Sequence, residues 1–210
     1  VRYADDWIIG VNGDKSVAKE LKAKATKWLS EELHLTLSPE KTHLTHATKG
    51  EAFFLGTRIK ASKGFLKKRI LRGRPTTMMT GVGAIHLKVP MKQVIFNLAE
   101  KGFCRKSDKF PTAKREWLVC DEWEIVERYN AVLRGILNYY SFVYNRNELQ
   151  RVHYILKFSL AHTLANRRRT SISKVLSAGK GSPTAFKNTK KGRVSVIFES
   201  PSFKVNTKKF

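Results

Sequence analysis

Cysteine is scarce in this sequence, and long apolar runs are missing. The only two cysteines, Cys104 and Cys120, do not form a Cys-x-x-Cys pair, which argues against a disulfide framework and a cysteine-based zinc site. Six histidines are scattered, and the one close pair, His43 and His46, has no cysteine or acid at ligand spacing. No apolar stretch approaches the roughly 20 residues that span a bilayer. The sequence therefore predicts no structural zinc and no membrane partner.

Acidic residues are also few compared with basic ones. The 210 residues include 41 Lys and Arg but only 17 Asp and Glu, which gives a formal net charge of +24. A compact fold with this charge repels itself unless a polyanion shares its surface, so nucleic acid is the expected partner. A generally basic solvated surface, as in a ribosomal protein, is the alternative, and it also leads to RNA. The length allows one large domain or two small ones.

Two adjacent carboxylates, Asp5 and Asp6, lie between two short apolar runs near the N-terminus. A β-hairpin over residues 1–11 would hold these side chains at its tip, clear of the strand hydrogen bonds. Carboxylate oxygens in such a place can fix the two Mg²⁺ ions, about 3.5–4 Å apart, that nucleotidyl transfer uses. Ordinary turn chemistry is the alternative, because Asp tolerates tight turns and caps its own backbone.

Five short motifs follow one another along the chain in an order that one protein family shares. They are Tyr3-Ala4-Asp5-Asp6, ELHLTLSPEKT at 32–42, Phe53-Phe54-Leu55-Gly56, RGILNYY at 134–140 and SLAHTLA at 159–165. In these motifs the chain resembles the C-terminal half of a reverse transcriptase of the group II intron maturase family. The first three are similar to the catalytic hairpin, the following palm motif and the primer-grip hairpin of that family. The last two are similar to the maturase thumb, often called domain X.

The resemblance implies roles for residues in the first three motifs. Asp5 would be the metal-bridging catalytic ligand for Mg²⁺, and Asp6 the weaker neighbouring ligand. Lys41 would lie near the incoming triphosphate, where its ammonium could neutralise or protonate the pyrophosphate leaving group. From local sequence alone, the competing interpretation of Lys41 is an ordinary surface lysine. For the primer-grip motif it is a plain hairpin with a buried Phe. The primer grip itself would consist of Phe54, Leu55 and Gly56.

Residues 1–75 are expected to form the C-terminal part of the polymerase palm. Asp14 is a suitable N-cap for an amphipathic helix that extends to about Leu33 and packs on the sheet. Leu35 and Leu37 alternate with polar neighbours and predict a strand that ends at Pro39. A dense basic run with glycines then predicts a mobile loop or linker, with the domain boundary near residue 75. Its expected RNA-binding cations are Lys67, Lys68, Arg69, Arg72 and Arg74.

Residues 76–180 are expected to form a helical thumb. Apolar residues at helical spacing predict a helix from Val89 that stops at Gly102, a second over roughly 118–143 and a third from about Glu148 to Arg168. Three antiparallel helices make a small bundle. One alternative to RNA binding by Tyr139 is that Tyr139 and Tyr140 are both packing residues. The expected RNA-binding residues of this part are Arg134, Asn138, Tyr139, Arg167, Arg168 and Arg169.

Residues 181–210 are polar and basic at first, and then alternate Val194, Val196 and Phe198. This pattern predicts a basic connector with a possible strand pair. The expected fold class is therefore α+β, the end of a polymerase palm with β-hairpins and a helix, followed by an α-helical thumb bundle.

The resemblance implies a group II intron-encoded maturase and reverse transcriptase. Such a protein binds its intron RNA to promote splicing and, when complete, copies RNA into DNA for intron mobility, with Mg²⁺, a primer–template and dNTPs. The chain begins inside a motif, without an initiator Met or a leader, so we expect a fragment that cannot polymerise alone. A splicing-only RNA-binding maturase is the alternative, and another reverse transcriptase lineage, such as a retron, is a third. The resemblance also implies a location in an organelle, the mitochondrion before the chloroplast, or in a bacterial cytoplasm. The oligomeric state stays open.

Overall fold

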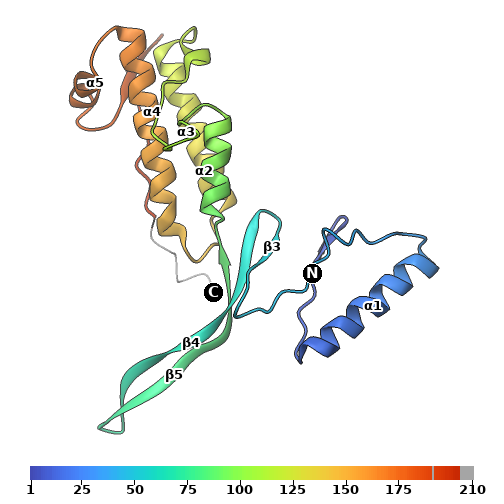
Figure 1. Cartoon of the computed structure of the whole chain (residues 1–210). Helices are drawn as coiled ribbons and strands as arrows, with labels where there is room; N and C mark the ends of the chain where they lie inside the picture. Colours follow the sequence, from blue (N-terminus) through green and yellow to red (C-terminus); the bar gives the residue numbers. More distant parts are fainter. Residues whose placement is uncertain (191, 204–210) are drawn as a thin grey trace. The chain divides into compact units, whose positions relative to one another are not determined.

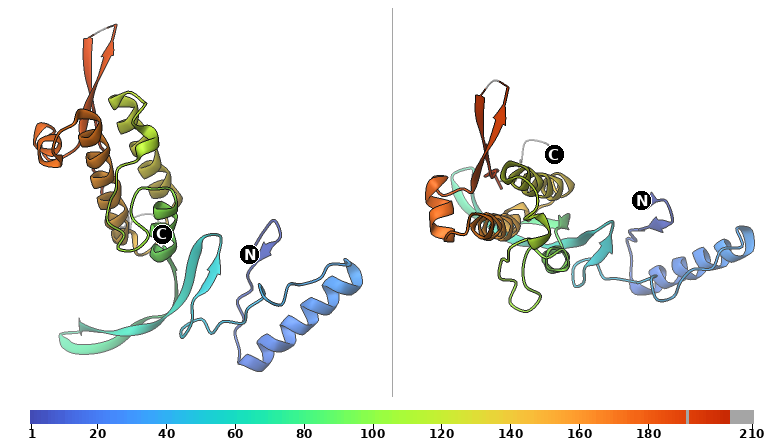
Figure 2. Two further views of the ribbon diagram at one scale, coloured as in Figure 1. Left: turned by 45° about the horizontal axis from the view of Figure 1, so that its top comes forward. Right: turned by 90° about the horizontal axis from the view of Figure 1, so that it is seen from above.

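The computed structural model describes residues 1–190 and 192–203. The chain divides into two compact units, Val1–His86 and Leu87–Phe210 (Figures 1 and 2). The division falls later than the boundary expected near residue 75, because residue 75 lies inside a strand. Helices and small antiparallel sheets occur together, so the predicted α+β class is confirmed. No helix in the described ranges is long and apolar enough to cross a membrane.

A very short hairpin opens the first unit. Its strands are β1 (Arg2–Tyr3) and β2 (Asp6–Trp7), with Tyr3 opposite Asp6 in the register. Ala4 begins the turn at a φ of 51°, and the Val1 ammonium donates a hydrogen bond to the Ile8 carbonyl at 2.9 Å. The predicted hairpin over residues 1–11 is present, although only four of those residues are strand.

Helix α1 spans Lys15–Glu32, and Asp14 caps it as predicted. One Asp14 oxygen accepts hydrogen bonds from the backbone amides of Ser16 and Val17, which would otherwise lack partners. The expectation that α1 packs on a sheet is wrong for the described structure, since no residue of this helix is buried. The two-residue strands of the neighbouring hairpin offer no surface wide enough to cover an 18-residue helix.

The strand expected at Leu35 and Leu37 is also absent. The Leu35 amide donates a hydrogen bond to the Leu29 carbonyl at 2.9 Å, so the chain turns back on the end of α1. A backbone amide bonded to a helix carbonyl cannot serve a strand ladder. Lys22 then holds the following turn by donating to the Thr42 carbonyl at 2.7 Å.

Strands β3 (Ala52–Phe54), β4 (Thr57–Leu71) and β5 (Arg74–Lys88) form one sheet in that order (Figure 1). The basic run predicted as a mobile loop is therefore mostly strand. Arg72 and Gly73 take φ values of 49° and 76° at the connection between β4 and β5. Positive φ at both central residues of a two-residue loop matches the right-handed twist of the strands, so the loop closes a hairpin.

The second unit is a helical bundle with a hydrophobic core. Its helices are α2 (Met91–Glu100), α3 (Glu122–Tyr139), α4 (Gln150–Arg168) and α5 (Ile172–Ala178), with two short 3₁₀ turns, η1 (Arg115–Trp117) and η2 (Arg146–Leu149). The three predicted helices are confirmed as α2, α3 and α4, and α5 is an addition. Helices α3 and α4 pack side by side (Figures 1 and 2). Fully buried side chains between them include Ile125, Leu133, Ile155, Leu156, Leu160 and Leu164.

Helix α2 stops where the sequence predicts. Gly102 has a φ of 76°, its amide donates to the Ala99 carbonyl, and the Phe103 amide donates to the Leu98 carbonyl at 3.0 Å. These two reversed hydrogen bonds satisfy carbonyls that the helix end leaves open. Phe103 then enters the core, where its ring packs edge-on against Trp117 and Tyr129.

Strands β6 (Thr184–Thr189) and β7 (Gly192–Ile197) form an antiparallel hairpin. This confirms the possible strand pair, but its base packs against the bundle and is not a free connector. The Asn130 side chain donates to the Ile197 carbonyl and accepts from the Glu199 amide, which ties α3 to the hairpin. Ala185 and Phe198 are buried, and His153 stacks on Phe198 with ring centroids 5.2 Å apart.

Candidate nucleic-acid interface

The acidic pair lies on the first hairpin, with one carboxylate at the turn and the other at the start of a strand, where the prediction placed both at the tip. Asp5 occupies the turn and Asp6 the first position of β2, and both side chains are exposed. In the described residues neither carboxylate accepts a hydrogen bond or joins an ion pair, and no group of three or more possible metal ligands exists. Two carboxylates are only part of the oxygen ligand set that Mg²⁺ takes, so the Mg²⁺ site stays a prediction.

Lys41 lies in an exposed turn that begins at Ser38 and is closed by two hydrogen bonds from Thr42 to the Ser38 carbonyl. No hydrogen bond or ion pair in the described part of the chain joins Lys41 to Asp5 or Asp6. Lys41 is therefore available to a ligand, and its catalytic role stays a prediction.

The expected primer grip is a tight hairpin turn. Phe54 pairs with Thr57 across β3 and β4, and Leu55 and Gly56 take φ values of 45° and 64° in the turn. Glycine suits this conformation, whereas leucine adopts it at a cost. The hairpin is as predicted, and Phe54 is partly buried, so the structure fits both the primer grip and the plain-hairpin alternative.

The hairpin of β4 and β5, which we call the basic ribbon (residues 57–88), contains no acidic residue. Its base is neutralised in part, because Glu51 pairs with Arg58 at 3.1 Å and with Lys60 at 3.9 Å. Toward the tip no carboxylate of the described chain lies within ion-pair distance. The five predicted RNA-binding cations, Lys67, Lys68, Arg69, Arg72 and Arg74, are all exposed and lie on this ribbon.

The predicted residues on α3 face solvent but differ in their surroundings. Arg134 is near Glu127 at 3.5 Å and Glu199 at 3.6 Å, so its charge is largely matched within the fold. Asn138 and Tyr139 are exposed, whereas Tyr140 is buried and meets the Tyr139 ring edge-on at 4.8 Å. Burial raises the pKa of Tyr140. Tyr140 thus packs in the fold, and Tyr139 is the more exposed of the two.

The arginine triplet at the end of α4 is divided between two roles. Arg168 binds both oxygens of Glu122, at 3.1 and 2.7 Å, and donates to the Thr184 carbonyl, while Arg167 donates to the Leu118 carbonyl. Arg169 takes the left-handed conformation that ends the helix and is exposed. Arg167 and Arg168 therefore make hydrogen bonds within the fold, and Arg169 is the arginine of the triplet that is exposed to solvent.

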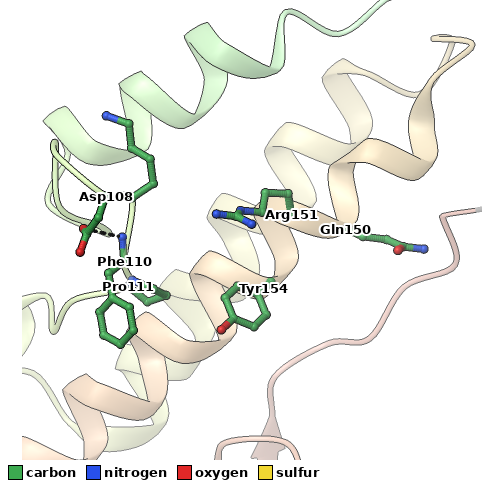
Figure 3. A pocket seen from close by; sticks show the side chains of 7 residues that line it. Asp108, Phe110, Pro111, Gln150, Arg151 and Tyr154 are labelled. Atoms are coloured by element: carbon green, nitrogen blue, oxygen red, sulfur yellow. Dashed lines mark hydrogen bonds between the residues drawn. The ribbon is translucent and has the colours of Figure 1, made fainter.

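Sequence reasoning missed an aromatic and cationic cleft on the second unit. It lies between the 108–111 segment and the first turns of α4, with a volume of about 480 Å³ (Figure 3). The one available signal was the spacing of Arg151, Tyr154 and Phe158 on one face of α4. The partner segment comes from a separate loop, and only folding brings it there. The lining residues are Asp108, Lys109, Phe110, Pro111, Gln150, Arg151 and Tyr154.

The fold and these surfaces define the class of protein. It is a strongly basic α+β protein whose cations outnumber their carboxylate partners, as in proteins that bind nucleic acid. Residues 82–207 match the family model for the type II intron maturase. The chain belongs to the type II intron maturase family.

Curated proteins agree with this assignment. The chain is 33% identical to the group II intron-encoded protein LtrA of Lactococcus lactis, over 84% of this chain and 30% of that protein. It is 36% identical to an uncharacterised 91 kDa protein in a cob intron of Schizosaccharomyces pombe, over 80% of this chain and 20% of that protein. Maturase K of Piper cenocladum is 28% identical, over 82% of this chain and 34% of that protein. The chain thus spans about a fifth to a third of the length of these relatives.

Proposed function

We propose that this chain acts as the RNA-binding palm end and thumb of a group II intron maturase, which binds its intron RNA and promotes splicing. The observation that carries the proposal is the match of the helical unit to the maturase family, together with a basic ribbon whose tip cations lack carboxylate partners in the described residues. Cations of this kind bind phosphates without reading bases, and the two strands of the ribbon fix where they are presented.

The complete protein, in this proposal, also copies RNA into DNA. Asp5 and Asp6 hold Mg²⁺, because exposed carboxylates are the ligand type that this hard cation prefers. When bound, the metal supplies Lewis-acid activation of the primer hydroxyl and charge neutralisation at the leaving group. Lys41 stabilises the departing pyrophosphate, and the Leu55–Gly56 turn positions the primer, with a dNTP and an RNA template as the other partners.

RNA binding is tested by changing all five ribbon cations, Lys67, Lys68, Arg69, Arg72 and Arg74, to Gln. Each phosphate that the protein no longer neutralises reduces the slope of log affinity against log salt by roughly 0.7–0.9. We expect a shallower slope and weaker binding to intron RNA by titration at several salt concentrations. The control changes Lys19, Lys24 and Lys27 on α1 to Gln, and per charge removed it should alter the slope less than the ribbon variant does. An unchanged slope in the ribbon variant contradicts the assignment.

DNA synthesis is tested by primer extension with Mg²⁺ on an RNA template. The protein used is a longer version of the chain that supplies a further metal-binding carboxylate, with and without the double change Asp5→Ala and Asp6→Ala. Synthesis that the variant loses supports the metal role of the hairpin. The 210-residue chain alone should show no extension, since the described residues bring no third metal ligand to the pair.

A splicing assay with the same pair of proteins distinguishes the splicing-only alternative. If the two functions are separable, the Asp5→Ala, Asp6→Ala variant still promotes splicing at the wild-type rate. Absence of DNA synthesis in a folded, RNA-binding wild type would favour a splicing-only maturase. Loss of splicing in a folded variant would contradict the separation of the two functions.

We further propose an organellar site of action, with the mitochondrion favoured over the chloroplast, or a bacterial cytoplasm. Related proteins carry names from a cob intron, COX1 introns and a bacterial intron, which supports these settings in general terms. Fractionation of the host cell with an antibody to the chain would decide among them.

A further inference from the structure

The cleft beside α4 is lined by aromatic faces that the fold leaves open. Phe110 and Tyr154 are 47% and 46% exposed, although each has an apolar ring that burial would stabilise. Tyr154 packs against Phe158 with ring centroids 4.6 Å apart, and Phe110 meets His162 edge-on at 5.9 Å. The rings therefore form two pairs, one along α4 and one between the loop and α4, and we call these four rings the ring platform.

The platform belongs to one helix face and one loop. Arg151, Tyr154, Phe158 and His162 are spaced by three or four residues, which places them along one side of α4. In Figure 3, Arg151 extends from α4 toward the loop that carries Asp108 and Phe110. The loop itself is held by the strand bridge between Cys104 and Pro111. A ligand in the cleft would thus meet groups that are already positioned.

The charge around the platform is positive. Arg105 lies over the Phe110 ring at 5.2 Å, and Lys109 and Arg151 line the cleft. The single lining carboxylate, Asp108, is occupied: it accepts from the Phe110 amide at 3.0 Å and from Arg105 at 3.4 Å. Arg151 has no ion-pair partner within the described ranges.

Titration of His162 agrees with this positive field. Burial lowers the pKa of His162, and the nearby Arg105 charge lowers it further. An imidazole with a lowered pKa is uncharged at physiological pH, whereas the guanidinium groups keep their charge. The cleft thus combines neutral ring faces with permanent cations.

We propose that this cleft holds one or two unpaired nucleotides of RNA, with bases stacked on Phe110 and Tyr154 and phosphates bound by Arg151 and Lys109. The inference rests on the RNA-binding function proposed above and names the kind of RNA that this part of the thumb takes. Duplex RNA hides its base faces and offers phosphates and groove edges, so it would gain nothing from exposed rings. Single strands present both a face and a backbone, which match a ring platform edged with cations.

The test compares two probes on the full 210-residue chain: a labelled single-stranded RNA of about twelve nucleotides, within the usual site sizes for single strands, and a duplex of the same sequence. The variant changes both Phe110 and Tyr154 to Ala, and Phe96→Ala, at 47% exposure on α2 outside the cleft, is the control. We expect at least roughly ten-fold weaker binding of the single strand and less than about two-fold change for the duplex. Tyr154→Trp should keep wild-type affinity, since any large ring can stack.

Each outcome decides between the proposals. Equal losses on both probes, or no loss on the single strand, overturn the cleft proposal. A wild-type chain that binds neither probe overturns RNA binding itself, and with it the cleft. A second measurement covers a variant that does not fold: 4-thiouridine in the single strand should crosslink, in the wild type, to peptides containing residues 108–111 or 150–158. Crosslinks that map only elsewhere also overturn the cleft proposal.

Discussion

The Tyr129 hydroxyl lies fully inside the second unit, at the centre of a saturated hydrogen-bond network. It is 2.8 Å from the Ser159 hydroxyl and 3.0 Å from the Thr163 hydroxyl. Those two groups already donate their protons, to the Thr112 and Ser159 carbonyls respectively. Tyr129 has a single hydroxyl proton, so it donates to one of these two oxygens, and this network links α3, α4 and the segment before η1.

Tyr129 predicts a loss of stability at high pH. Burial raises the pKa of Tyr129 to about 12 in the folded state, above the value near 10 expected when unfolded. The neutral form is favoured by folding, so this stabilisation is complete below about pH 10 and is lost as pH rises from about 10 to about 12. The loss should be on the order of 2 kcal/mol. Urea unfolding across this range measures it, and Tyr129→Phe, which cannot ionise, should lose less stability than the wild type.

Arg168 and Arg169 are adjacent but should respond differently to the same change. Arg168→Ala leaves the partly buried Glu122 carboxylate without its bidentate partner, and we expect a loss of about 1–2 kcal/mol in the free energy of unfolding, reduced by solvent screening. Arg169→Ala removes an exposed side chain and should change stability by less than about 0.5 kcal/mol. Denaturant titration measures both. Equal effects would contradict the division of the triplet.

At the scale of the elements, the basic ribbon is where sequence reasoning failed. Charges and glycines in residues 60–75 indicate a loop, yet β4 and β5 each extend over 15 residues. Apolar and polar residues alternate only weakly along the two strands of the ribbon, because both faces are largely exposed and neither needs to be uniformly apolar. The decisive signal was Arg72-Gly73, a two-residue loop with positive φ that favours a hairpin. The helices of the second unit were easier, since their buried faces impose a strict 3.6-residue period.

Two glycines of the helical unit predict opposite effects of one substitution. Gly102→Ala places a side chain at a φ of 76°, where nothing closer than 3.7 Å blocks it, so the cost is backbone strain of about 1 kcal/mol. Gly135→Ala lies inside α3 with no atom within 4 Å of the new carbon, and it should stabilise by about 0.5–1 kcal/mol. Thermal unfolding of the two variants checks the signs. A stabilised Gly102 variant would contradict the described end of α2.

At the scale of the whole molecule, the two units differ in how much core they contain. Thr57 is the one buried residue of Val1–His86, all of which the structure describes, whereas the described residues of the second unit include 24 buried hydrophobic ones. Hydrophobic burial is the main source of folding free energy, so the second unit should be stable independently.

This difference predicts the behaviour of the separated units. A fragment of residues 87–210 should unfold cooperatively, with a single transition by circular dichroism and dispersed NMR signals. Residues 1–86 alone should show no cooperative transition, because a helix, a short hairpin and a three-stranded sheet without a shared core cannot offset their conformational entropy. A cooperative transition of the 1–86 fragment at a similar temperature would contradict this.

The sequence by itself determined the α+β class, the helical period of the second unit, the caps at Asp14 and Gly102, and the excess of positive charge. These features are local or additive, because they follow from neighbouring residues and from composition. Tertiary structure decided which cations are used by the fold, as with Arg168 on Glu122, and which rings stay open, as with Phe110 and Tyr154. Both depend on segments far apart in the chain, and only packing brings those segments within contact distance.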